Sequence, residues 1–131
     1  LMRRGITDAR ASARVLYGTA VRFRTAGADQ DEIGYSYNIS EGGLYVRTLA
    51  PLARTTDAWL ELCAPRSDRR VRLEGQVMWT RGFGPNDAAT VPPGFGVKLT
   101  GGSSSDLERF VRGYRAFAAE APKRSGAPAA R

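Results

Sequence analysis

The chain alternates between apolar and polar positions over most of its length, which is the pattern of β-strands that bury one face. Val21 and Phe23, for example, alternate with Arg22 and Arg24. Segments rich in glycine, proline and aspartate separate the alternating stretches and are typical of turns. The pattern predicts six strands, at residues 14–24, 33–40, 44–49, 57–64, 71–81 and 95–100.

Near the C-terminus the period changes from that of a strand to that of a helix. Residues 105–108, Ser-Asp-Leu-Glu, form a capping-box sequence, which predicts that a helix begins there. Apolar residues then recur at helical spacing and form one stripe. They are Leu107, Phe110, Val111, Tyr114 and Phe117. We expect this stripe to pack against the sheet, with a partner-binding face as the alternative.

Together these elements predict a mainly β fold, a six-stranded antiparallel β-barrel followed by a C-terminal α-helix. Closing the barrel removes free sheet edges. We predict a flexible arm at residues 1–13, the barrel and helix at 14–120, and a disordered tail at 121–131. The arm has no hydrophobic period, and the tail is rich in proline, glycine and alanine.

The composition argues against most enzymes. The chain contains no histidine and a single cysteine, Cys63. This removes histidine-based acid–base chemistry and the common zinc sites. No paired carboxylates or nucleophile–base pair can be assembled from the sequence. We therefore expect no catalytic residue, no metal and no cofactor.

The distribution of charge points to an anionic partner. The formal net charge is +7, and residues 1–25 hold six arginines against one acid, Asp8. Arginine offers a planar fork that matches phosphates and guanine edges, so we expect a phosphate-bearing partner. A solvated basic face is the alternative. No apolar run approaches the ~20 residues that span a bilayer, and no secretory signal pattern is present. We expect no membrane insertion and a cytoplasmic location.

Two short motifs carry the candidate chemistry. Arg10 and Arg14 stand four residues apart before the first strand. Further along, the stretch NISEGG lies between two strands. Period-two alternation turns Ile39 inward and leaves Asn38 and Ser40 on the opposite face. Two short hydrogen-bonding side chains are therefore expected to point the same way.

The glycines of the second motif predict a sharp turn. Gly42 and Gly43 allow positive φ and a tight reversal of the chain. By itself, NISEGG also fits an ordinary turn, because asparagine, serine and glycine are common turn residues.

Taken in order, RASAR, NISEGG, EGQVMWTR and GFGVKL resemble the PilZ domain family over roughly residues 8–118. Arg10 and Arg14 match the family's RxxxR sequence. Its [D/N]xSxxG sequence is matched by Asn38, Ser40 and Gly43. The stretches NISEGGLYVRT and EGQVMWTR look especially like the PilZ-type domains of myxobacterial proteins.

The resemblance implies a receptor for the bacterial second messenger cyclic di-GMP, which signals to an effector protein or a fused domain. Arg10 and Arg14 would then offer guanidinium forks to guanines and phosphates. Asn38 would pair with a guanine edge, Ser40 would donate a hydrogen bond, and Gly43 would let the backbone approach. A ligand that touches arm and barrel together would clamp the arm down.

Other residues are weaker candidates for the same site. Arg47 and Arg81 stand near strand ends and could reach a phosphate, with ordinary exposed charge as the alternative. Trp79 falls on the inward side of the alternation and is expected in the core, with stacking on a base as the alternative. Family members often carry a further arginine directly before RxxxR, where this chain has Ala9. That departure favours one ligand molecule per domain.

Two other readings stay open beside the cyclic di-GMP receptor. A PilZ-like fold that has lost the ligand would work through protein contacts only. A basic barrel could instead bind single-stranded nucleic acid. We rank this last, because aromatic residues do not interleave with the basic ones in an obvious strip.

Overall fold

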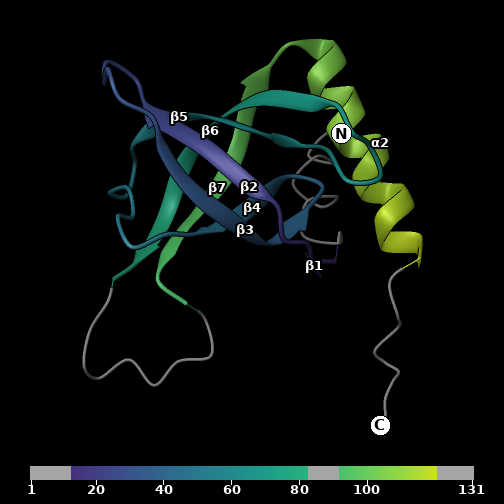
Figure 1. The fold of residues 1–131 in the computed structure, drawn as a ribbon, viewed down its shortest axis with the longest axis horizontal. Coiled ribbons are helices and arrows are strands. Elements are labelled where there is room, and N and C mark those ends of the chain that lie inside the picture. The colour runs from purple at the N-terminus through teal and green to yellow at the C-terminus, as the bar shows by residue number, and fades with distance from the viewer. Residues whose placement is uncertain (1–12, 83–91, 121–131) are drawn as a thin grey trace, which may run out of the picture.

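The structure is a computed structural model that describes residues 13–82 and 92–120. Figure 1 shows these residues as a β-barrel with one helix lying beside it. The strands are β1 (Val15–Leu16), β2 (Ala20–Thr25), β3 (Glu32–Ser40), β4 (Gly43–Arg47), β5 (Asp57–Cys63), β6 (Arg70–Arg81) and β7 (Gly94–Gly102), and the helix is α2 (Ser104–Glu120).

The sheet closes on itself. Antiparallel pairing runs through β3, β2, β5, β6, β7 and β4, and β4 pairs back onto β3. Six strands therefore form the ring, while β1 pairs with β3 outside it. The predicted six-stranded antiparallel barrel with a C-terminal helix is confirmed, and the structure adds the short outer strand β1.

The interior is filled by the inward residues of the alternating strands. Phe23, Leu60, Leu73 and Phe95 are fully buried. The rings of Phe23 and Phe95 meet edge to face at 5.0 Å between centroids. Burying a side chain of this size contributes roughly 1.5–3 kcal/mol. The alternation therefore predicted these core positions correctly.

In β6 the alternation holds as far as Val77 and then breaks. Val77 pairs with Val97, but the next pair joins Trp79 to Gly96, so Met78 is an extra residue. Such a β-bulge shifts the phase of the side chains. Trp79 is consequently 43% exposed, and its assignment to the core is wrong.

The helix α2 begins two residues earlier than the capping box at Ser105 predicted. Its N-cap is Ser103, whose Oγ accepts a hydrogen bond from the Asp106 N–H at 3.1 Å. The Asp106 carboxylate accepts a second bond from the Arg72 N–H of β6 at 2.9 Å. The first bond caps the helix, and the second holds the helix start against the barrel.

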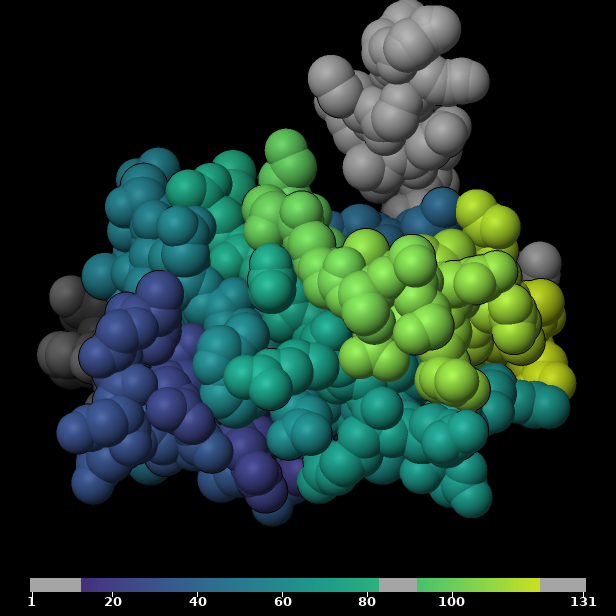
Figure 2. All heavy atoms as spheres, turned by 90° about the horizontal axis from the view of Figure 1, so that it is seen from above, coloured from purple at the N-terminus to yellow at the C-terminus, as the bar shows by residue number. Residues whose placement is uncertain are grey.

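The apolar stripe of α2 faces the barrel, as expected. Phe110 and Tyr114 are buried, and Leu107 and Val111 pack partly buried against the same core. Figure 2 shows the helix, in green and yellow, lying directly on the strands. The stripe is therefore a packing surface in this structure.

A buried serine joins the two strands that share one edge of β3. Between β1 and β2, the Ser36 hydroxyl donates to the Tyr17 carbonyl and accepts from the Thr19 N–H at 3.0 Å. Tyr17 itself packs edge to face on Phe117 of α2, with 5.2 Å between centroids. The start of the described chain is thereby fixed to both the barrel and α2.

Candidate ligand-binding site

The second motif lies where β3 turns into β4. Asn38, Ile39 and Ser40 pair with Tyr45, Leu44 and Gly43 respectively. Ile39 is fully buried in the core. Asn38 and Ser40 therefore lie on the outer face of the barrel, as the alternation predicted.

The first motif meets the second directly. The Arg14 Nη1 donates a hydrogen bond to the Asn38 Oδ1 at 2.8 Å, across 24 residues of sequence. Arg14 is exposed, so its guanidinium group is accessible from solvent. Arg10, the other arginine of the motif, lies outside the described residues. The structure thus brings together one residue from each motif.

Ser40 is less accessible than its neighbour Asn38. It is 7% exposed, and its Oγ lies 3.4 Å from the Gly43 carbonyl oxygen, at the long limit of a hydrogen bond. Its hydroxyl is therefore not engaged in a strong internal hydrogen bond with that carbonyl. Donation from Ser40 to a ligand stays a prediction.

Gly43 has a clear structural reason to be glycine. A Cβ at this position would lie 2.2 Å from the Val97 carbonyl oxygen of β7. The chain reverses sharply between Ser40 and Gly43, as predicted. The glycines with positive φ in the described part of the chain are Gly27 and Gly102, so neither Gly42 nor Gly43 uses the conformational freedom of glycine here. Close strand packing, and not turn conformation, accounts for Gly43.

An aromatic stack lies beside the Arg14–Asn38 pair on the same outer face. Tyr45 and Trp79 both pair with Gly96, on opposite sides of β7. Because Gly96 has no side chain, the two rings stack across it, 5.0 Å apart at 22°. Tyr45 is fully buried, whereas Trp79 is partly exposed. An exposed indole on a rigid base is a suitable surface for stacking a nucleobase.

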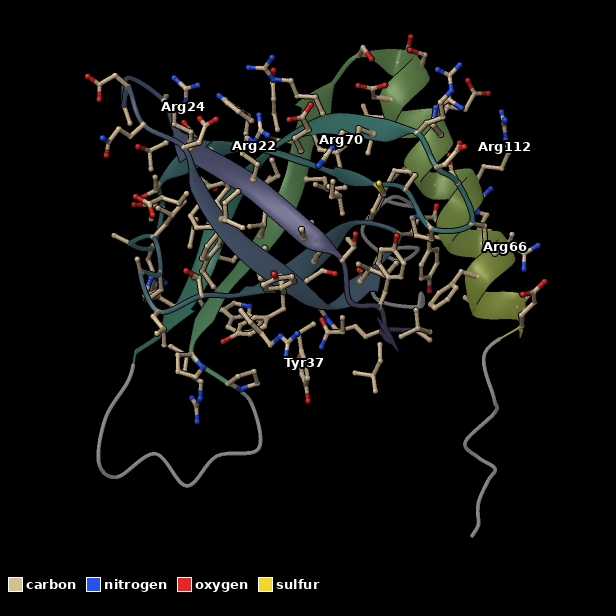
Figure 3. All side chains as sticks on the ribbon, viewed as in Figure 1. Arg22, Arg24, Tyr37, Arg66, Arg70 and Arg112 are labelled. Carbon is tan, nitrogen blue, oxygen red and sulfur yellow. The ribbon has the colours of Figure 1, made fainter. Side chains whose placement is uncertain are left out.

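Two β-bulges direct aromatic side chains to this face. One is the bulge at Met78 in β6, and the other lies between Ser36 and Asn38 in β3. The second makes Tyr37 the extra residue, and its ring lies 6.1 Å from that of Tyr45. Figure 3 shows Tyr37 pointing outward from the barrel wall. Bulges commonly re-aim side chains next to functional sites.

The two weaker arginine candidates lie in the adjacent row of the same sheet. Arg47 and Arg81 both pair with Gly94, from β4 and β6 respectively. Arg47 is exposed and Arg81 is half-buried. Tyr35, which is 53% exposed, pairs with Arg47 from β3. The fold therefore places these candidates on the face that carries Asn38.

The helix contributes two contacts that the sequence analysis missed. The Arg115 guanidinium donates to the Glu41 carboxylate, with Nη2–Oε2 at 2.7 Å and Nε–Oε1 at 3.3 Å. The Tyr114 hydroxyl donates to the Ala13 carbonyl. These pairs are 74 and 101 residues apart in sequence, so no local pattern could have indicated them.

Tyr17, at the junction of β1 and α2, has a raised pKa. Burial raises the pKa of the Tyr17 phenol above its ordinary value of about 10.0. The charge of Cys63 raises this pKa further, and a hydrogen bond with Thr19 partly opposes the shift. The Tyr17 hydroxyl donates to the Cys63 carbonyl at 2.8 Å, which favours the protonated form.

The described residues hold neither a metal-binding cluster nor a membrane-spanning helix. No group of three or more His, Cys, Asp or Glu side chains there is arranged to hold a metal ion. In the same residues, no helix combines the length and apolarity that a membrane span requires.

Comparison with known families identifies the chain. The PilZ domain model matches residues 8–115, and the protein belongs to the PilZ domain family. PilZ domains are generally adaptor modules that bind cyclic di-GMP. A search of curated protein sequences found no match. The narrower likeness to myxobacterial PilZ domains stays a prediction.

Solved structures show the same fold at low sequence identity. The Bacillus subtilis inhibitor of motility, MotI/DgrA, superposes with a TM-score of 0.63 at 17% identity, over 85% of this chain. This chain spans about half (52%) of that protein. The PilZ domain of CeSA from a cellulose-synthesizing bacterium superposes with a TM-score of 0.56 at 16% identity, over 82% of this chain and 99% of that one.

Proposed function

We propose that this PilZ domain is a cytoplasmic receptor module for cyclic di-GMP, without catalytic activity, that signals to a partner protein or a fused domain. The observation that carries this proposal is the hydrogen bond between Arg14 and Asn38. It unites the two family motifs on one accessible face, where a single ligand can touch both.

The residues of this face suit a guanine dinucleotide. Arg14 offers a fork to guanine O6 and N7 or to phosphate, a geometry worth about 1–3 kcal/mol of discrimination, and Arg10 of the same motif, outside the described residues, would offer a second. Asn38 supplies an amide for a guanine edge, and Trp79 supplies an exposed ring for stacking. Micromolar affinity needs about 8 kcal/mol net, which a few such contacts can supply when the cost of ordering the arm is modest.

Calorimetric titration tests the proposal. We expect heat with cyclic di-GMP, and much weaker binding of cyclic di-AMP and GTP. Arg10→Ala and Asn38→Ala should each weaken cyclic di-GMP binding at least about tenfold, or about 1.4 kcal/mol. No heat at tens of micromolar ligand would favour a module that works by protein contacts alone. Strong salt dependence without preference for the cyclic dinucleotide would favour nucleic-acid binding.

We also propose that the ligand holds residues 1–13 against the barrel through Arg10. Hydrogen exchange of the backbone amides in this arm should slow when cyclic di-GMP is added. Equal exchange rates with and without the ligand would contradict this clamp while leaving the binding proposal intact.

A further inference from the structure

Consecutive residues of α2 touch the two motif segments. Tyr114 donates to the carbonyl of Ala13, directly before Arg14. Arg115 donates to the carboxylate of Glu41, directly after Ser40. These contacts place the Arg115 guanidinium beside the segment that carries the second motif, while its neighbour Tyr114 anchors the same turn of α2 to the segment that carries Arg14.

The bond between Arg115 and Glu41 is one that the protein can exchange. The two side chains are 65% and 30% exposed, and an ion pair so open to water contributes little to stability. Arginine and phosphate form charge-assisted, often bidentate bonds, which are stronger than neutral ones. A dianionic ligand next to Ser40 would repel Glu41 and attract Arg115, so both charges favour a change of partner.

We propose that Arg115 is a further ligand-binding residue, which exchanges the Glu41 carboxylate for a phosphate of the ligand. The inference rests on the proposed cyclic di-GMP site at Arg14 and Asn38. When the exchange occurs, the ion pair that ties α2 to the β3–β4 turn is broken. Ligand occupancy is thereby transmitted to the helix.

The chain offers a matched control three residues earlier on the same helix. Arg112 forms an ion pair with Glu108 at 3.2 Å, and the two side chains are 72% and 69% exposed. Figure 3 shows Arg112 pointing away from the barrel. Replacing Arg112 changes the net charge as much as replacing Arg115 does, without altering the motif face.

The first experiment is calorimetric titration of cyclic di-GMP into the wild type, Arg115→Gln and Arg112→Gln. Arg115→Gln should weaken binding about tenfold, because a charged hydrogen bond to phosphate is lost. Arg112→Gln should stay within about twofold of the wild type, as only a screened, distant charge is removed. Equal affinities for the two variants would overturn the inference.

The second experiment tests the exchange itself. Glu41→Gln removes a competitor for Arg115 and a charge that repels the ligand, so it should tighten binding about threefold. Glu108→Gln is its control and should have little effect. When Glu41→Gln is added to Arg115→Gln, it should increase the affinity for cyclic di-GMP by less than it does in the wild type. Weaker binding by Glu41→Gln would overturn the exchange, because Glu41 would then be a positioning residue for Arg115.

The failures of the two proposals are distinguishable. A folded wild type that gives no heat with cyclic di-GMP overturns both the receptor function and the role of Arg115. A wild type that binds, loses affinity with Arg14→Ala and does not distinguish Arg115→Gln from Arg112→Gln overturns only the role of Arg115. Thermal unfolding of each variant establishes that it is folded.

Discussion

Two faces of the barrel carry a tryptophan beside arginines, and only one of them suits an anion. The motif face, with Arg14, Asn38 and Trp79, lies around β3, β4, β7 and the last residues of β6. The second face, centred on Trp59 of β5, lies three strands from β4 in either direction around the ring. There the Arg24 and Arg72 guanidinium carbons lie 5.1 and 4.1 Å from the Trp59 ring centroid.

The difference between the faces lies in the partners of the arginines. On the Trp59 face, Arg24 forms an ion pair with Asp31 at 2.7 Å, and Arg22 lies 3.6 Å from Glu61. Figure 3 shows Arg22 and Arg24 on this part of the barrel. Arg14 bonds instead to the neutral amide of Asn38. Its positive charge is not neutralised by that partner, so it can attract a phosphate.

A hollow of about 420 Å³ lies beside Trp59 on the other face, and two acidic residues, Asp57 and Glu74, are among those that line it. These negative charges would repel a dianionic dinucleotide. Carboxylate partners beside the arginines, and not the presence of a ring or a hollow, make the Trp59 face less suited to an anion than the motif face.

The largest expected effect is the loss of stability when Gly43 is replaced. This test distinguishes residues of the motif face that support the fold from residues that contact the ligand. Gly43→Ala would place a Cβ 2.2 Å from the Val97 carbonyl oxygen. Overpacking of this kind should cost about 2–3 kcal/mol and lower Tm by about 10–20 °C. Thermal unfolding checks this. Gly18→Ala is the control, because its nearest atom is the Ser36 carbonyl oxygen at 3.8 Å. An unchanged Tm for Gly43→Ala would mean that the fold does not require glycine here, and that ligand binding is its remaining role.

A paired substitution of arginines tests the comparison itself. Arg14→Ala should weaken cyclic di-GMP binding at least about tenfold, or about 1.4 kcal/mol. Arg24→Ala on the Trp59 face removes the same charge but should change the affinity less than about twofold, since its carboxylate partner already neutralises it. Calorimetric titration measures both. Similar losses of affinity in the two variants would mean that binding depends only on the net charge of the protein.

The two tryptophans provide a third test. Trp79→Ala should weaken cyclic di-GMP binding about fivefold, or about 1 kcal/mol, because one stacking surface is lost. Trp59→Ala should leave the affinity unchanged. Tryptophan fluorescence offers a direct reading, since ligand stacking should quench Trp79. Quenching that persists in Trp79→Phe would show that the ligand binds elsewhere.

The smallest expected effect is a change in stability when Tyr17, which attaches the segment that carries Arg14, is replaced. Because the Tyr17 pKa is raised on folding, the stabilising effect of this group is fully present below about pH 10.0. It is lost as the pH rises through the raised pKa. Tyr17→Phe should lower the free energy of unfolding by less than about 1 kcal/mol at neutral pH, and its stability should fall less steeply at alkaline pH. Denaturant unfolding from pH 8 to 11 checks this. If the free energies of unfolding of the wild type and of Tyr17→Phe fell in parallel over this pH range, the prediction would be wrong.

The local pattern of the chain determined much of this protein. Alternation with a period of two placed Phe23 and Ile39 inward and Asn38 outward, because side chains alternate across any strand whatever its neighbours. The order of the two motifs pointed to the PilZ family, which the family model confirms. These features depend on residues close together in sequence.

Tertiary structure alone decided which residues share the motif face. The bulge at Met78 exposes Trp79, and Gly96 lets it stack on Tyr45, although the two rings come from different strands. The contact between Arg115 and Glu41 joins a helix to a turn 74 residues away. Register, bulges and helix docking are set by packing across the whole barrel. No short stretch of sequence contains the contacts that decide them.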